Sequence, residues 1–156
     1  AQTELFDANM RARLAETVFH RDPRSNRMAV RLRHEGPGFA ADGGLSVLSE
    51  ITQPGDIQVT GDGTPVILMA EAQTTGGYPR IASILPCDLA RAAQCPPGMP
   101  LQFSWIDRAA GLAAERAAAQ VKLHPNPVLR DPHDMADLLS YSLIDGVTNG
   151  DSGDRS

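Results

Sequence analysis

The stretch from Gln73 to Arg80 brings together side chains that bind and polarise small polar molecules. It reads Gln-Thr-Thr-Gly-Gly-Tyr-Pro-Arg, so an amide, two hydroxyls, a phenol and a guanidinium surround a pair of glycines. Glycine has no Cβ and lets a ligand approach the main chain closely. Uncharged amides and hydroxyls beside an arginine suit recognition of a planar amide or a carboxylate, and stabilisation of an oxyanion. No residue in the stretch is an obvious general base.

Two common glycine-rich phosphate sites do not match this stretch. A Walker loop ends in Gly-Lys-Ser/Thr, which the stretch lacks. A dinucleotide-binding loop opens a helix, whereas Pro79 and the run at 80–85 predict another strand. Two alternatives remain: a binding loop that follows a buried strand, and a plain β-turn between core strands, since glycine pairs are common in turns.

Outside this stretch, few polar residues are candidates for a binding or catalytic site. Gln58 sits between Ile57 and Val59, so it points to the opposite face of its strand from both. Arg27 and Arg80 are each either a carboxylate clamp or a solvated strand residue. The four histidines and two cysteines show no metal-ligand spacing. The sequence therefore predicts no metal site in this chain.

Several short strands must position these residues. Alternating or apolar runs predict them at 27–33, 45–51, 57–60, 66–70, 80–85 and 101–105. The Asp62-Gly63 step favours a tight hairpin turn between the strands at 57–60 and 66–70. Short strands separated by turn signals predict a mainly β fold, either a barrel or a sandwich.

Helices are expected after most of these strands. Asp88 and Asp107 are expected to cap helices, and Asp131 followed by Pro132 favours a third helix start. The expected helices run over 88–94, 107–121 and 131–146. The expected organisation is a β body at 1–106, a helical extension at 107–146 and a disordered tail at 147–156.

The composition is that of a globular protein, with 42% apolar and 21% charged residues. A net charge of −5 disfavours nucleic acid and an anionic membrane surface as partners. No apolar run approaches the roughly 20 residues of a membrane span, and no charged-then-apolar leader opens the chain. With only two cysteines, the expected location is the reduced cytoplasm.

Four separate motifs are informative as a set. They are Ser25-Asn26-Arg27-Met28-x-x-Arg31-Leu32, Glu50-Ile51-x-x-x-Gly55-x-Ile57-Gln58-Val59, Asp62-Gly63-x-Pro65 and the run from Gln73 to Pro79. Their order and spacing resemble the biotin-dependent carboxyltransferase family, which includes allophanate hydrolase subunit 2 and the C subunit of 5-oxoprolinase. The resemblance covers about 1–106 and only the second, C-terminal half of the family's full-length protein.

The resemblance implies a cyclophilin-like β-barrel that belongs to a longer protein, whose N-terminal half is missing here. It also implies a smaller partner of the type of allophanate hydrolase subunit 1 or the B subunit of 5-oxoprolinase. The implied function is that of a subunit in an ATP-dependent complex that processes an amide or lactam, related to the carboxyltransferase domain of urea carboxylase. ATP would be used by the complex, and any carboxybiotin would be carried on another domain. The fragment alone is expected to be inactive.

The family motifs also imply the residues of the site. Gln58, Gln73 and Tyr78 are expected to be catalytic, and the expected substrate-binding residues are Arg27, Thr74, Thr75, Gly76, Gly77 and Arg80. Arg80 stands where the family commonly has lysine, and Ala29 stands where it commonly has glycine. The alternative implied by some members is a regulatory protein that complexes a partner inhibitor of a sensor kinase, without turnover.

Overall fold

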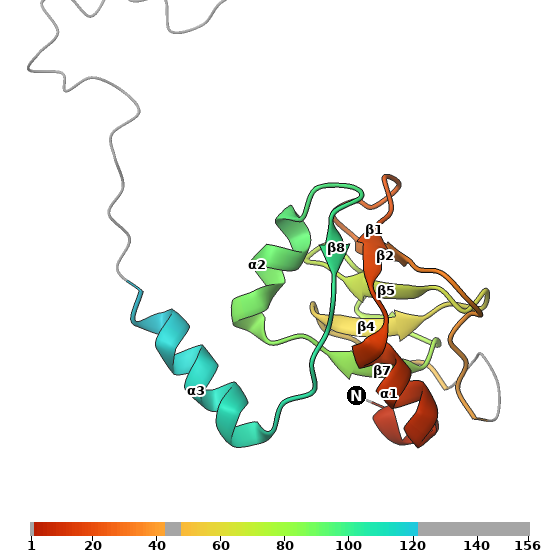
Figure 1. The fold of residues 1–156 in the computed structure, drawn as a ribbon, viewed down its shortest axis with the longest axis horizontal. Coiled ribbons are helices and arrows are strands. Elements are labelled where there is room, and N and C mark those ends of the chain that lie inside the picture. The colour runs from red at the N-terminus through yellow and green to blue at the C-terminus, as the bar shows by residue number, and fades with distance from the viewer. Residues whose placement is uncertain (1, 43–47, 122–156) are drawn as a thin grey trace, which may run out of the picture. The chain divides into compact units, whose positions relative to one another are not determined.

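Six strands form one antiparallel sheet in the computed structural model, which describes residues 2–42 and 48–121 (Figure 1). Across the sheet the order is β7-β4-β5-β2-β1-β8. The strands are β1 (Phe19–Arg21), β2 (Ala29–Arg33), β4 (Asp56–Val59), β5 (Pro65–Leu68), β7 (Arg80–Ser83) and β8 (Pro100–Leu101). Outside this sheet, two short strands pair with each other, β3 (Glu50–Ile51) and β6 (Thr75–Gly76). The prediction of a mainly β body is confirmed.

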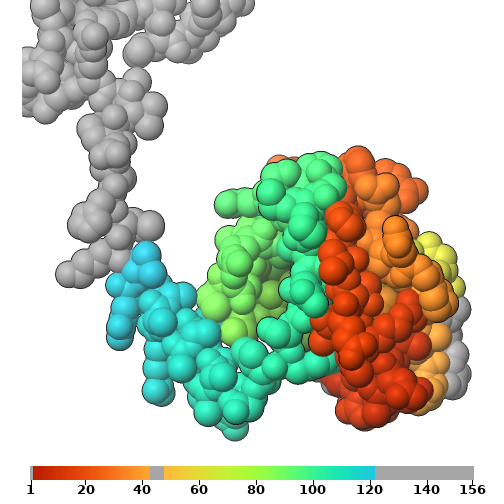
Figure 2. All heavy atoms as spheres, in the orientation of Figure 1, coloured from red at the N-terminus to blue at the C-terminus, as the bar shows by residue number. Residues whose placement is uncertain are grey.

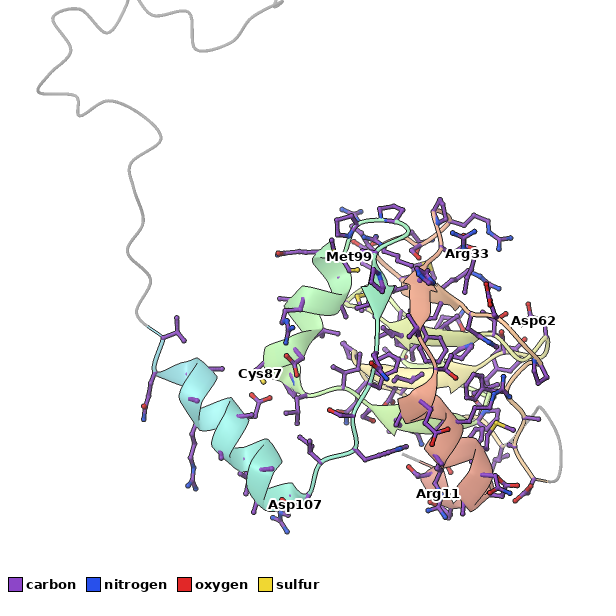
Figure 3. The ribbon with its side chains drawn as sticks, in the orientation of Figure 1. Arg11, Arg33, Asp62, Cys87, Met99 and Asp107 are labelled. Carbon is purple, nitrogen blue, oxygen red and sulfur yellow. The ribbon has the colours of Figure 1, made fainter. Side chains whose placement is uncertain are left out.

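The predicted hairpin is confirmed at the centre of the sheet. β4 and β5 pair antiparallel, with Ile57 opposite Ile67, and Asp62 lies in the turn that joins them (Figure 3). Its carboxylate accepts hydrogen bonds from the Thr60 hydroxyl at 2.5 Å and the Thr64 amide at 3.1 Å. These two bonds lower the pKa of Asp62 to about 2. Every residue of β4 and β5 is buried, so both faces of the hairpin are covered.

The described strands do not close into the barrel that the family resemblance implies. Within residues 2–42 and 48–121, β7 and β8 stand at the two ends of the strand order. β8 begins with Pro100, which has no N–H to donate to a further strand. The outer edge of β7 is met by Gln2, which exchanges two hydrogen bonds with the main chain of Arg80, at 3.0 and 3.2 Å. The described fold is therefore an open antiparallel sheet.

The N-terminal segment contains three elements that the sequence patterns did not predict: η1 (Thr3–Leu5), α1 (Ala8–Glu16) and β1. Asp7 caps α1 by accepting a hydrogen bond from the Met10 amide at 2.6 Å. Leu14 alone of α1 is buried, so the helix lacks the repeating apolar face that marks a helix in a sequence. The segment nevertheless supplies a large share of the core through Phe6, Leu14 and Phe19.

β8 is shorter than the strand predicted at 101–105. After it, two side chains bind α1 instead of a neighbouring strand: the Gln102 amide donates to Ala15 O at 3.0 Å, and the Trp105 indole donates to Arg11 O at 2.9 Å. Figure 2 shows this segment lying against the N-terminal part of the chain. Attachment to a helix through side chains replaces the ladder and explains the early end of the strand.

Two helices follow β7 in the described residues: α2 (Pro86–Gln94), which lies between β7 and β8, and α3 (Arg108–Ala119), which follows β8. Asp107 caps α3 as predicted, accepting a hydrogen bond from the Ala110 amide at 2.7 Å. The predicted cap of α2 is wrong, because the helix begins at Pro86 and Asp88 lies inside its first turn. Proline suits that first turn, since its ring fixes a helical φ and its missing N–H has no partner to lose.

Some predicted elements fall beyond the described residues. The strand predicted at 45–51 is represented by β3, while 43–47 lie outside the described part. The helix predicted at 131–146 and the tail at 147–156 also lie outside it. Among the helices that are described, none is long and apolar enough to cross a membrane.

Candidate functional site

A pocket of about 220 Å³ lies where the Gly-Gly stretch meets the central strands. Its apolar lining consists of Met28, Ala29, Leu68 and Ala72. Its polar lining is uncharged and consists of Thr52, Gln58, Gln73, Thr75 and Tyr78. A buried charge without a partner is costly, whereas a neutral polar group can exchange its water for amide and hydroxyl partners. The pocket therefore suits an amide or another neutral polar group.

Gln58 and Gly76 approach each other very closely in this pocket. Gln58 lies on β4 and is 6% exposed. A Cβ on Gly76 would lie 2.7 Å from Gln58 Nε2, which is too close for two heavy atoms. The φ of Gly76 is not in the left-handed region, so close approach, and not backbone freedom, requires glycine here. Gln58 Nε2 also donates a long hydrogen bond to Tyr78 O, at 3.4 Å.

A small ribbon, defined as residues 50–52 and 73–76, borders the pocket. It is built on the antiparallel pairing of β3 and β6. Thr52 extends the pairing, since its amide donates to Thr74 O at 2.9 Å and its hydroxyl donates to Gln73 O at 2.7 Å. These bonds engage main-chain oxygens of the stretch, so the side chain of Gln73 stays available to the pocket.

The structure brings most of the predicted site residues to this one pocket. The lining includes Gln58, Gln73, Thr75, Gly76, Gly77 and Tyr78. Thr74, Arg27 and Arg80 are not part of it. The Arg27 side chain is 85% exposed and pairs with Glu71 at 3.1 Å, close in sequence to the lining residue Met28. The catalytic and substrate-binding roles assigned to these residues stay predictions.

Arg80 is engaged by oxygen atoms outside the pocket lining. Its side chain is 12% exposed. Nη1 donates to Ile51 O at 3.0 Å and to Asp56 Oδ2 at 3.3 Å. Nη2 donates to Glu50 Oε2 at 2.6 Å. The guanidinium therefore connects β7 to both β4 and β3.

Asp56 is the buried carboxylate in this connection, with its side chain 7% exposed. Burial alone would raise its pKa, but hydrogen bonds from the Ser83 hydroxyl, the Gln53 amide and Arg80 outweigh burial and lower the pKa. The Ser83 and Gln53 bonds measure 2.6 and 3.0 Å. Asp56 is thus ionised at neutral pH and supplies Arg80 with a buried counter-charge.

Sequence reasoning missed the apolar lining of the pocket and Thr52. Met28 and Ala72 lie at positions where an apolar residue indicates only a core strand or a loop end, so their residue types did not indicate a pocket. Thr52 directly follows a predicted strand and joins the site through main-chain pairing, which residue types do not reveal. A signal existed for Ala29, which stands where the resembling family commonly has glycine.

A second hollow, of about 720 Å³, lies towards the other end of β2. It is lined by Thr17, Val18, His20, Arg33, His34 and Glu35, none of which was predicted as a site residue. In residues 2–42 and 48–121, no group of three or more His, Cys, Asp or Glu side chains is placed to hold a metal ion. The smaller pocket therefore remains the candidate site.

An open antiparallel sheet whose central strands meet a neutral, glycine-bordered pocket defines a β-sheet domain with a candidate site for a small polar molecule. Residues 1–105 match the family described as the carboxyltransferase domain, subdomain A and B, and the chain belongs to this family. The resemblance seen in the sequence motifs is confirmed by this match.

Two relatives bear the name of the C subunit of 5-oxoprolinase. The Escherichia coli (strain K12) protein is 42% identical over 96 residues, which cover 58% of this chain and 30% of that protein. The Haemophilus influenzae protein is 41% identical over 82 residues, which cover 53% of this chain and 26% of that protein. The chain thus spans less than a third of the length of either relative.

A solved structure shares the fold. The Kluyveromyces lactis urea carboxylase aligns with a TM-score of 0.67 and 24% sequence identity, over 76% of this chain and 11% of that chain. At this identity the likeness concerns the architecture of the sheet and its helices, and it says nothing of the reaction.

Proposed function

We propose that this chain is part of the C subunit of a multi-subunit enzyme that consumes ATP while it processes a small amide or lactam, as in 5-oxoprolinase. The observation that carries the proposal is the uncharged pocket, in which Gln58, Gln73 and Tyr78 surround a space bordered by glycine backbone. The 42% identity to the 5-oxoprolinase protein of Escherichia coli supports the same choice.

The proposed roles follow from the chemistry of the lining. Gln58 and Gln73 each offer a donor and an acceptor and orient the amide of the substrate. The Tyr78 hydroxyl donates to the oxygen on which negative charge develops, which stabilises the transition state. Thr75 and the main chain of the Gly-Gly pair approach the ligand closely. Arg27, next to the pocket in sequence, binds a substrate carboxylate that extends beyond it.

The remaining components belong to the same proposal. ATP is used by the complex, and this chain binds a smaller partner of the type of allophanate hydrolase subunit 1 or the B subunit of 5-oxoprolinase. Carboxybiotin takes part only if the complex transfers a carboxyl group, and it is then carried on another domain. Strands from the rest of the longer protein complete a cyclophilin-like barrel, and the complex works in the cytoplasm. A structure of the intact protein in which no further strand pairs with the outer edges of β7 and β8 would contradict the barrel.

The test uses the complete reading frame that encodes this chain, co-expressed with its neighbouring subunits. ATP consumption is followed with 5-oxoproline and, in parallel, with urea plus a biotin carboxylase. We expect ATP consumption that depends on 5-oxoproline. A stable complex that turns over neither compound would contradict the proposal and favour a regulatory binding protein.

Gln73→Ala tests the pocket itself. We expect turnover to fall by about a hundredfold, because losing a group that orients the substrate amide misplaces the reacting atoms, and a misplacement of about 1 Å can cost roughly that factor. The melting temperature should stay unchanged, since the ribbon uses the main-chain oxygen of Gln73 and not its amide. The matched control is Gln120→Ala, which removes an exposed amide at the end of α3. Wild-type turnover in Gln73→Ala would remove this residue from the site.

A further inference from the structure

The ribbon that borders the pocket needs a fixed position if the pocket is to keep its shape. It shares no ladder with the six-stranded sheet among the described residues. Both residues of β3 are exposed, and the Ile51 side chain is 73% exposed. Apolar burial therefore contributes little to holding β3 in place, and polar contacts must do so.

Arg80 supplies such contacts from the adjacent strand of the main sheet. On the ribbon it binds the Glu50 carboxylate at 2.6 Å and the main-chain oxygen of Ile51 at 3.0 Å. On the sheet it binds Asp56 at 3.3 Å. Because Asp56 is also held by Ser83 and Gln53, the sheet end of this bridge is fixed before Arg80 is added.

We propose that Arg80 is a positioning residue, which fixes the ribbon against the sheet and thereby sets the gap between Gly76 and Gln58. In this role it acts on the pocket through Glu50 and Ile51 and makes no contact with the ligand. The inference concerns the same site as the proposed function, and it rests on that function only where turnover is measured.

Arginine suits this role better than lysine does. Two nitrogens of one planar group bind the ribbon and the sheet at the same time, whereas the ammonium of lysine is a single point of charge. Arg80→Lys should therefore keep the pair with Asp56 and lose part of the grip on the ribbon. A residue that only neutralised a substrate charge would tolerate this change.

Hydrogen exchange on the 156-residue chain measures the position of the ribbon directly. Glu50→Ala removes the side-chain contact at the ribbon end of the bridge and leaves Arg80 with Asp56 and with the main-chain oxygen of Ile51. We expect amide exchange in 50–52 and 73–76 to speed up by about tenfold or more, while β4 and β5 keep wild-type rates. The matched control is Asp88→Ala on α2, whose side chain is 46% exposed and pairs with Arg91, against 50% exposed for Glu50.

Turnover of 5-oxoproline in the co-expressed complex separates positioning from substrate contact. A positioning role predicts that Glu50→Ala and Arg80→Gln lower kcat/KM in parallel, and that Arg80→Lys falls between them and wild type. Unchanged ribbon exchange in Glu50→Ala would overturn the inference. So would a loss of turnover confined to Arg80→Gln, with Glu50→Ala like wild type. If the wild-type complex has no turnover, the proposed function fails, and the exchange rates still decide the role of Arg80.

Discussion

Single residues shape the candidate site through the space they leave as well as through the atoms they bring. Gln58 is nearly fully buried, yet its amide reaches the pocket because Gly76 has no side chain to block it. The glycine and the glutamine therefore form a unit, although they lie on different strands. A side chain at Gly76 would displace the amide of Gln58.

Gly76→Ala is expected to disable the site while leaving the fold standing. The new Cβ would lie 2.7 Å from Gln58 Nε2, which is the far end of a flexible side chain and can move. Overpacking of this kind costs about 1–3 kcal/mol, whereas misplacing a group by about 1 Å can cost roughly a hundredfold in rate. Kinetics of the complex and thermal unfolding of the chain measure the two effects separately.

Gly61→Ala is the matched control for this substitution. A Cβ there would lie 4.0 Å from the Tyr78 ring, an ordinary contact, and Gly61 does not have a left-handed φ. We expect near wild-type turnover for the control. Equal losses in both variants would show that Gly76 is needed for the loop as a whole and not for Gln58.

Among the elements, the turn of the central hairpin carries a titratable group with a clear role. Asp62 stays ionised through its bonds with Thr60 and Thr64, and its pKa falls from the ordinary 3.8 to about 2. A carboxylate with a lowered pKa in the folded state stabilises that state fully above pH 3.8 and loses this contribution as the pH falls towards 2.

Asp62→Asn should therefore lower the melting temperature near pH 6, and the difference from wild type should shrink as the pH is taken down to about 2. Thermal unfolding across this range gives the comparison. The side chain is 63% exposed, so the effect is modest. A difference that is the same at both ends of the range would mean that the turn depends on shape and not on charge.

The elements that sequence patterns predicted are those with strong local signals. The hairpin follows from Asp62-Gly63 between two apolar runs, and α3 follows from its cap, Asp107. α1 was not predicted, because it buries a single residue, Leu14, and so shows no repeating apolar face. β3 was predicted only as the end of a longer strand at 45–51, and the two-residue β6 is too short to show any alternation.

The grouping of residues in the candidate site was predictable where they lie within one stretch of sequence, and unpredictable where it depends on distant partners. Five pocket residues stand close together in the sequence, namely Gln73, Thr75, Gly76, Gly77 and Tyr78, and the apolar neighbours of Gln58 indicated which face of its strand it occupies. Arg80 was left open between a clamp and a solvated residue, because its partners Glu50 and Asp56 lie 30 and 24 positions away. Such pairing is a property of the folded chain, and local pattern does not report it.

For the molecule as a whole, the N-terminal segment connects the edge of the sheet at β7 to the hydrophobic core. Gln2 exchanges hydrogen bonds with the main chain of Arg80, 78 positions later, and so meets the outer edge of β7. Phe6 then enters the core and is 1% exposed. Arg80 is thus bound by two segments: its side chain contacts the ribbon, and its main chain pairs with Gln2 near the start of the chain.

Phe6→Ala tests how far the stability of the fold depends on packing of the N-terminal segment. Truncating a fully buried phenylalanine costs about 3–5 kcal/mol, a large part of the roughly 5–15 kcal/mol that stabilises a typical domain. We expect a much lower urea midpoint with an unchanged slope. Val18→Ala is the control, because that side chain is 47% exposed and its loss should change stability by about 0.5 kcal/mol or less. Equal midpoints for the two variants would mean that the sheet and its pocket stand without the N-terminal segment.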